Sequence, residues 1–184
     1  MKTTYLVTAL VAIGFAGLGI AVSNWSSNAN AAPPAAAATA QVSEALYTSK
    51  LPSVPAQADG SLKSLEEFRN NVVVVNFWAT WCGPCVKEMP ALSALQTELA
   101  AKKIKFIGIG IDNPDDMRTF AQKYKITYPL YVAGMSGTQL SSQLGNGQGG
   151  LPFTVILNKA GAVVKTYRGA LDMDKLRKDV LAVR

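Results

Sequence analysis

The pattern of apolar and polar positions predicts alternating strands and helices in the second half of the chain. Residues 72–78 form a β-branched and aromatic run in which Asn76 is the one polar residue, which is typical of a strand buried on both faces. Over 83–101 the apolar residues recur at spacings of three and four, which predicts a helix, with a kink or a broken hydrogen-bond ladder at Pro90. A second apolar strand is predicted over 104–111.

Capping and turn signals define the elements that follow. Asn113 and Pro114 form a helix start, with an N-cap residue and a proline at the first helical position. Two apolar runs flank the turn at 158–161, which predicts a β-hairpin. The remaining predicted elements are a short strand over 129–132, a short helix over 136–144 and a final helix from Asp172 to about Val180. This order predicts an α/β fold whose mixed central sheet, parallel first and antiparallel at the end, is flanked by helices on both faces.

The first 49 residues differ in character from the rest. Lys2 precedes residues 6–22, which carry no charge, and an A-x-A cleavage pattern follows at 29–31. Residues 1–22 are therefore predicted to be an export signal, either a cleaved signal peptide or an uncleaved signal-anchor in contact with a membrane. Residues 23–49 are rich in Ala, Ser, Asn and Pro and are predicted to be a linker, because they have too little large apolar surface to offset the entropy of ordering them. The globular domain is then expected over 50–184.

Composition excludes several kinds of site. The 184 residues carry a net charge of +6, but the basic residues are scattered and form no stripe interleaved with aromatic residues, so we expect no nucleic-acid binding. Histidine is absent, which excludes Cys–His and Ser–His catalysis and any His-ligated metal site. Two cysteines cannot close a four-cysteine zinc site within one chain. We therefore expect neither a metal nor another cofactor.

The candidate chemistry lies in Trp81-Cys82-Gly83-Pro84-Cys85, between the first strand and the first helix. Unpaired backbone N–H groups and the helix dipole favour an anion at a helix N-terminus, so Cys82 is predicted to be an exposed thiolate nucleophile with a lowered pKa. Cys85 is predicted to be the more buried, resolving thiol, close enough for a Cys82–Cys85 disulfide. Such a pair performs thiol–disulfide exchange through a mixed disulfide. The alternative is a permanent structural disulfide in an exported protein.

Other residues near the pair are candidates for supporting roles. Glu88 lies three residues after Cys85 on the same helical face, and it is either a proton acceptor for the resolving thiol or a solvated helix acid. Asn76 cannot titrate, so it is interpreted as a satisfied structural amide. Trp81 is expected to shield Cys82 or to contact a partner, and Trp78 is expected in the core.

The sequence from Val73 to Cys85, continued by Glu88-Met89-Pro90, resembles the TlpA/ResA-like branch of the thioredoxin superfamily. The Cys-Gly-Pro-Cys core is shared with thioredoxin itself, and the Glu-Met-Pro continuation points to this branch. With supporting features around residues 59–65, 108–112 and 151–161, the resemblance covers about residues 50–184. It implies a thioredoxin-like fold, with Pro152 as a cis-proline facing the sulfurs and Glu88 as an active-site glutamate. Asn76 replaces the buried acid of thioredoxin, so a proton acceptor would have to be Glu88 or water.

The resemblance also implies a cellular role. Such proteins are typically exported or membrane-anchored and reduce protein disulfides, often of apocytochrome c, with electrons from an integral membrane thiol carrier. The expected location is the cell envelope, on the periplasmic side, anchored to the inner membrane or soluble after signal cleavage. A disulfide oxidase or isomerase remains open, because it uses the same chemistry at a higher potential. A peroxiredoxin-like peroxidase fits poorly, since Ala79 stands where that family has threonine, and a copper chaperone fits poorly because histidine is absent.

Overall fold

The computed structural model describes residues 43–55 and 61–183 of the chain. The predicted export signal or anchor at 1–22 and most of the predicted linker lie outside these residues. In the part of the chain that is described, no helix combines the length and apolar character needed to cross a membrane.

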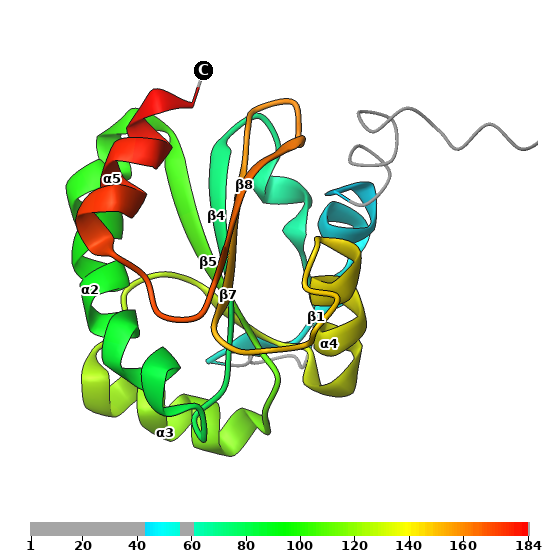
Figure 1. The fold of residues 1–184 in the computed structure, drawn as a ribbon. Helices are drawn as coiled ribbons and strands as arrows, with labels where there is room; N and C mark the ends of the chain where they lie inside the picture. Colours follow the sequence, from blue (N-terminus) through cyan, green and yellow to red (C-terminus); the bar gives the residue numbers. More distant parts are fainter. Residues whose placement is uncertain (1–42, 56–60, 184) are drawn as a thin grey trace, which may run out of the picture. The chain divides into compact units, whose positions relative to one another are not determined.

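A six-stranded mixed sheet forms the centre of the domain, in the order β2-β6-β5-β4-β7-β8 (Figure 1). The middle strands pair in parallel, β4 with β5 and β5 with β6, whereas β7 is antiparallel to β4 and forms a hairpin with β8. The short β2 is antiparallel to β6 at the other edge. The strands are β2 (Ser53–Val54), β4 (Val72–Trp78), β5 (Ile104–Gly110), β6 (Leu130–Val132), β7 (Phe153–Leu157) and β8 (Val163–Arg168). The predicted α/β class and mixed sheet are confirmed.

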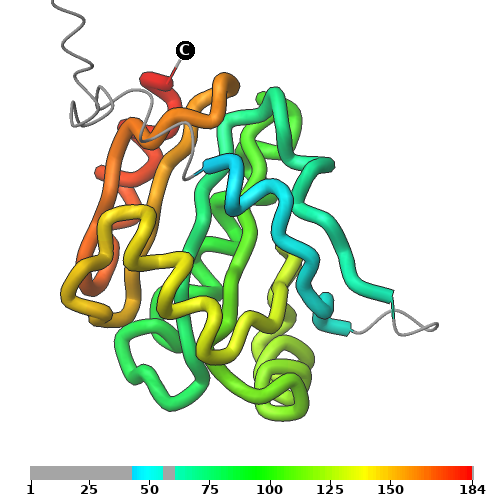
Figure 2. The backbone as a smooth tube through the Cα atoms, turned by 90° about the vertical axis from the view of Figure 1, so that its right-hand side faces the viewer, coloured from blue at the N-terminus to red at the C-terminus, as the bar shows by residue number. Residues whose placement is uncertain are grey.

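Helices cover both faces of this sheet. On one face lie α2 (Gly83–Leu99), α3 (Pro114–Tyr124) and α5 (Met173–Ala182), and on the other lies α4 (Gly134–Gln143) (Figures 1 and 2). The N-caps of α3 and α5 are the predicted residues, because the side chains of Asn113 and Asp172 each accept a hydrogen bond from a main-chain N–H in the first turn. Helix α2 continues through Pro90 to Leu99 and is followed by the 3-10 turn Ala100–Lys102. The kink or broken ladder expected at Pro90 stays a prediction.

The alternation of side chains along β4 divides the core into two clusters. Val72, Val74 and Trp78 point to the face covered by α2, α3 and α5. Val73, Val75 and Phe77 point to the face covered by α4. Successive side chains of a strand point to opposite faces, and both faces are covered here, so every residue of this strand is buried, as its largely apolar sequence predicts.

The folded domain begins before residue 50. Residues 43–48, at the end of the predicted linker, form a helix whose Leu46 and Tyr47 are buried in the α4-side cluster. These two side chains provide the large apolar surface that is scarce in the sequence of the preceding Ala-rich stretch. The same region contains the two-stranded ribbon of β1 (Lys50–Leu51) and β3 (Lys63–Ser64) and the 3-10 turn Leu65–Phe68. Two-residue strands carry no periodic signal, so the sequence did not predict them.

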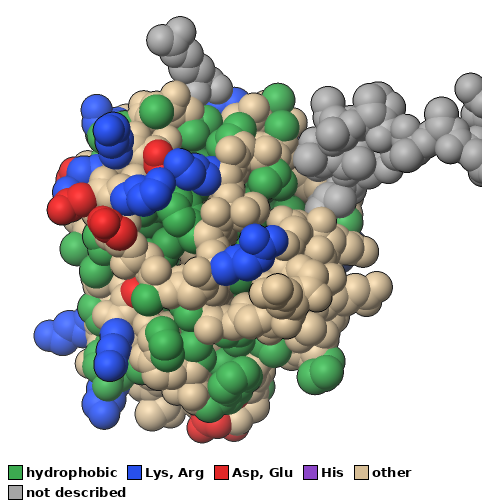
Figure 3. Space-filling view, in the orientation of Figure 1, with side chains coloured by type: hydrophobic (Ala, Val, Ile, Leu, Met, Phe, Trp, Pro, Cys, Tyr) green, Lys and Arg blue, Asp and Glu red, His purple; other side chains and the backbone are tan. Residues whose placement is uncertain are grey.

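Helix α5 is tied to β8 by a polar network. Asp179 on α5 accepts from Lys165 Nζ at 2.7 Å and from the Tyr167 hydroxyl at 2.5 Å, both on β8, and Lys175 adds a further contact. Acidic and basic side chains accordingly gather over α5 in the space-filling view (Figure 3). Exposed ion pairs contribute little individually. This network nonetheless joins β8 to α5, the two elements that flank the short connection whose main chain contributes a group to the site.

Candidate active site

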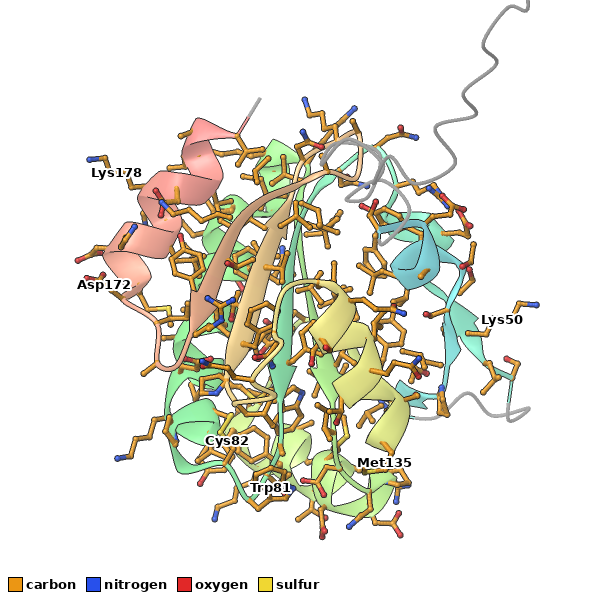
Figure 4. All side chains as sticks on the ribbon, turned by 45° about the vertical axis from the view of Figure 1, so that its right-hand side comes forward. Lys50, Trp81, Cys82, Met135, Asp172 and Lys178 are labelled. Carbon is orange, nitrogen blue, oxygen red and sulfur yellow. A yellow bond between two sulfur atoms is a disulfide. The ribbon has the colours of Figure 1, made fainter. Side chains whose placement is uncertain are left out.

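The site lies where the carboxyl ends of β4, β5 and β6 meet the N-termini of α2, α3 and α4. Trp81 and Cys82 follow β4, and Met135 lies in the first turn of α4 at the same end of the sheet (Figure 4). Ligands and reactive groups in α/β folds collect at this edge because the strand-to-helix turns converge there.

Cys82 and Cys85 form a disulfide, with their Cα atoms 5.3 Å apart. Cys82 is the N-cap of α2, and the backbone N–H of Cys85 donates to its Sγ at 3.3 Å. This N–H already points at Cys82 Sγ, which is the geometry that would stabilise a thiolate there after reduction. The predicted difference in exposure between the two cysteines is present but small, since Cys82 is 6% exposed and Cys85 is fully buried. The prediction of an exposed Cys82 was therefore too strong, because the sulfur lies against the helix start rather than in open solvent.

The residues around the pair set its position. Pro84 occupies the first turn of α2, where a missing N–H costs nothing, and Gly83 is the first helical residue. Asp112, just after β5, accepts from both the backbone N–H of Thr80 at 2.7 Å and its hydroxyl at 2.5 Å. This carboxylate therefore fixes the turn that leads from β4 to Cys82, a contact that sequence reasoning missed.

The two tryptophans next to the site have opposite environments. Trp78 is completely buried and packs against Phe120 of α3 with ring centroids 5.1 Å apart, which confirms its predicted core role. Trp81 is 69% exposed beside Cys82 (Figure 4). Its side chain is therefore free to contact another molecule at the redox pair.

Glu88 is buried, so its interpretation as a solvated helix acid is wrong. Its Oε1 accepts a hydrogen bond from Asn76 Nδ2 at 2.9 Å, and its Oε2 accepts one from the backbone N–H of Leu171 at 3.0 Å. Burial raises the pKa of this carboxyl to about 7, and the two hydrogen bonds oppose the rise without cancelling it. A carboxyl with a pKa near neutrality can both accept and release a proton under ordinary conditions.

Asn76 belongs to this site rather than to a purely structural role. It lies opposite Thr154 of β7 in the sheet register, and its Nδ2 donates to Thr154 Oγ1 at 3.0 Å as well as to Glu88. Both side chains are buried. Asn76 Oδ1 has no hydrogen-bond partner in the described part of the chain, so the predicted satisfied amide is satisfied on one side only. The two-residue period of β4 places Asn76 on the same face as Trp78, and this signal could have placed it opposite α2.

The bond between Leu151 and Pro152 is cis, as the family resemblance implied. Phe153, the next residue, pairs with Phe77 near the end of β4, which puts Pro152 at the edge of the sheet where Cys82 follows. That Pro152 faces the two sulfurs stays a prediction.

A groove of about 510 Å³ runs beside the redox pair and reaches Glu88. It lies between the first turns of α2 and the β8–α5 connection and is lined by Gly83, Pro84, Lys87, Glu88, Ala91, Ala170, Leu171 and Met173. Within residues 43–55 and 61–183 there is no group of three or more His, Cys, Asp or Glu side chains that could hold a metal ion.

A disulfide at the start of a helix that follows a central strand, with a buried carboxyl on the same helix, defines a thioredoxin-like thiol–disulfide oxidoreductase. The chain belongs to the Redoxin family, whose model matches residues 33–182.

Individual proteins agree with this class. The chain is 26% identical over 129 residues to the thiol-disulfide oxidoreductase ResA of Geobacillus thermodenitrificans, covering 68% of this chain and 71% of that protein. A putative thiol:disulfide interchange protein DsbE from Chlorobium tepidum has a TM-score of 0.63 at 22% identity over 73% of this chain and 91% of its own. A secreted thiol-disulfide isomerase from Corynebacterium glutamicum has a TM-score of 0.62 at 26% identity, covering 75% of this chain and 81% of that chain. The predicted thioredoxin-like fold and ResA-like resemblance are confirmed.

Proposed function

We propose that the protein reduces disulfides of other proteins outside the cytoplasm, through a cycle between the dithiol and disulfide forms of Cys82 and Cys85. The observation that carries this proposal is the redox pair at the start of α2 with the buried Glu88 one turn further along the helix. A permanent structural disulfide would not need a carboxyl with a pKa near neutrality beside it.

In the proposed cycle the reduced protein begins with a Cys82 thiolate. It attacks one sulfur of a client disulfide, forming a mixed disulfide and releasing the client's other sulfur as a thiolate, which takes a proton from water. Cys85 then gives its proton to the Glu88 carboxylate and attacks Cys82 Sγ. The client's second sulfur leaves as a thiolate and takes a proton from water, so the client departs with both sulfurs reduced. The two electrons it gained come from Cys82 and Cys85, which remain on the protein as the oxidised Cys82–Cys85 disulfide.

The proposed location and partners follow from the N-terminal sequence and the relatives. The predicted export signal at 1–22 and the secreted relative from Corynebacterium glutamicum support a place in the cell envelope, on the periplasmic side, with or without a membrane tether. Each turnover oxidises the pair, so an electron donor is required, and we propose an integral membrane thiol carrier. The proposed client is a protein with a disulfide, of which apocytochrome c is the family's usual example.

The reduction potential of the pair tests the direction of the reaction. The full-length protein is equilibrated with graded thiol buffers, and the reduced fraction is read from the mass shift on alkylation. A reductase is expected to have a potential below roughly −240 mV, near the thioredoxin end of the scale. A value of roughly −120 to −180 mV would instead assign an oxidase or an isomerase. The Corynebacterium glutamicum relative is named as an isomerase.

The role of Glu88 has a separate test in the pH–rate profile of client reduction. The rate is expected to rise with pH through about 7, because the carboxylate that accepts the Cys85 proton is formed above this pKa. Glu88→Gln is expected to remove this inflection. An unchanged profile in Glu88→Gln would show that another group, or water, takes the proton.

A further inference from the structure

The two oxygens of Glu88 face chemically different groups. Oε2 accepts from the backbone N–H of Leu171, which can only donate. Oε1 accepts from the side-chain amide of Asn76, which carries a donor on one arm and an acceptor on the other. When Glu88 takes up a proton, Oε1 is the favoured position, because an unprotonated Oε2 is a stronger acceptor for the Leu171 N–H than a hydroxyl oxygen would be.

Protonation of Oε1 creates a conflict with Asn76 as it lies. The Glu88 Oε1–H is then a donor, and it faces Nδ2, which is also a donor. The acceptor that this proton needs is present in the same side chain, because Asn76 Oδ1 is buried without a hydrogen-bond partner in the described structure. A half turn about the last side-chain bond of Asn76 exchanges the two arms of its planar amide.

We propose that Asn76 is a positioning residue whose amide turns by half a rotation each time Glu88 gains or loses a proton. With Glu88 ionised, Nδ2 donates to the carboxylate. With Glu88 protonated, Oδ1 accepts from the carboxyl. The inference deepens the proposed role of Glu88 as the proton acceptor of Cys85 and rests on it for its use in the reaction cycle.

Thr154 allows the turn because a hydroxyl can donate or accept. Its Oγ1 now accepts from Asn76 Nδ2 at 3.0 Å. After the turn the same hydroxyl donates to Oδ1. One arm of the buried amide lacks a partner in either orientation, the acceptor Oδ1 before the turn and the two N–H donors of Nδ2 after it. The gain that offsets this cost is an acceptor for the Glu88 hydroxyl. An aspartate at this position would place a second carboxyl against Glu88, and an apolar residue would serve neither state.

The other ionisable groups near Glu88 do not compete in the oxidised protein. Cys85 is held in the disulfide and does not titrate. Burial, together with the charge of Glu88, raises the pKa of Tyr128, so its phenol stays neutral over the range in which Glu88 titrates. Lys87 lines the same groove as Glu88 and adds a cation there. The oxidised protein therefore isolates the titration of Glu88.

The turn is measurable by NMR on the full-length, oxidised protein. Glu88 is followed by its carboxyl carbon and Asn76 by its side-chain amide, across a pH titration. We expect the Asn76 amide nitrogen and protons to shift with the same midpoint as Glu88. The nuclear Overhauser contact between the Asn76 amide protons and Thr154 should be present above that midpoint and lost below it. The same contact on both sides of the midpoint would overturn the proposal and make Asn76 a fixed structural amide.

Glu88→Gln provides a matched control. The Leu171 N–H still needs an acceptor, so the new amide must place its oxygen there and turn its NH₂ toward Asn76. Asn76 is then expected to show the low-pH signature at every pH. A high-pH signature in this variant would contradict the proposal, and if the variant does not fold, the titration of the unsubstituted protein decides by itself.

The two proposals fail separately. If the amide turns but the pH–rate profile is the same in Glu88→Gln as in the parent protein, the turn stands and the proton-acceptor role of Glu88 is lost. If the profile loses its inflection but the Asn76 contact to Thr154 never changes, the proton-acceptor role stands and the turn is lost.

Discussion

The two faces of β4 carry the same apolar pattern but differ at one position. Toward α4 the strand presents Val73, Val75 and Phe77, and this cluster is apolar along the whole strand. Toward α2 it presents two valines and Trp78, but Asn76 interrupts them and contacts Glu88. Buried polar groups cost free energy unless they are paired. The difference shows that the α4 face is built for stability, whereas the α2 face accepts a polar inclusion directly behind the redox pair.

Substitutions on the two faces of β4 are expected to differ most in their effect on activity. Cys82→Ser should abolish client reduction, because a hydroxyl is not ionised at neutral pH and cannot form the mixed disulfide. Cys85→Ser should trap the mixed disulfide instead, visible as a covalent adduct on a non-reducing gel. Val75→Ala on the α4 face is the control, with an expected cost in stability of about 2 kcal/mol and unchanged activity per folded molecule. Full activity in Cys82→Ser would disprove the mechanism.

A polar side chain on the α4 face of β4 should destabilise the protein much more than Asn76 does on the α2 face. Val75→Asn is expected to lower the free energy of unfolding by about 4 kcal/mol, because it loses apolar burial and buries an amide among apolar neighbours. Urea denaturation measures the loss, and Val75→Ala separates the missing methyl groups from the buried amide. Equal losses in the two variants would mean that the α4 face can pair or hydrate an amide, and the contrast between the faces would fall.

The buried pair of Asn76 and Glu88 should make the stability of the protein depend on pH. The pKa of Glu88 is about 7 in the folded protein and lies near 4.5 in the unfolded chain, so the folded state binds more protons between these values. The free energy of unfolding should therefore fall as pH rises through this window, by about 3 kcal/mol in total. Glu88→Gln should lack this component. Denaturation of both oxidised proteins at pH 4.5 and 8 measures it, and a constant difference between them would contradict the raised pKa.

The smallest effect is expected at the hydroxyl behind Asn76. Thr154→Val keeps the shape of the side chain but removes the acceptor for Asn76 Nδ2, at an expected cost of about 1 kcal/mol. Thr154→Ser, which retains the hydroxyl, is the matched control and should keep the hydrogen bond while losing one methyl group. If thermal or urea denaturation shows Thr154→Val to be no less stable than Thr154→Ser, the Asn76–Thr154 contact contributes nothing measurable.

Much of the fold was predictable because its signals are local. The largely apolar run of β4, the three- and four-residue spacing of α2 and the N-caps Asn113 and Asp172 each act within one element. The helix at 43–48 was missed because it is stabilised by Leu46 and Tyr47 packing against distant residues, within a segment whose composition resembles a linker. A short helix surrounded by Ala and Ser has no local pattern that reveals such burial.

By itself the sequence determined the redox chemistry, since Cys82 and Cys85 are placed by two intervening residues and a helix start. Only the tertiary structure decided the state of Glu88. Its contacts come from Asn76, 12 residues away, and Leu171, 83 residues away, and its pKa depends on the burial that the packing of α2 on the sheet and the β8–α5 connection produces. The proposed nucleophile is thus set by local backbone geometry, whereas the proposed proton acceptor is set by desolvation, a property of the assembled core.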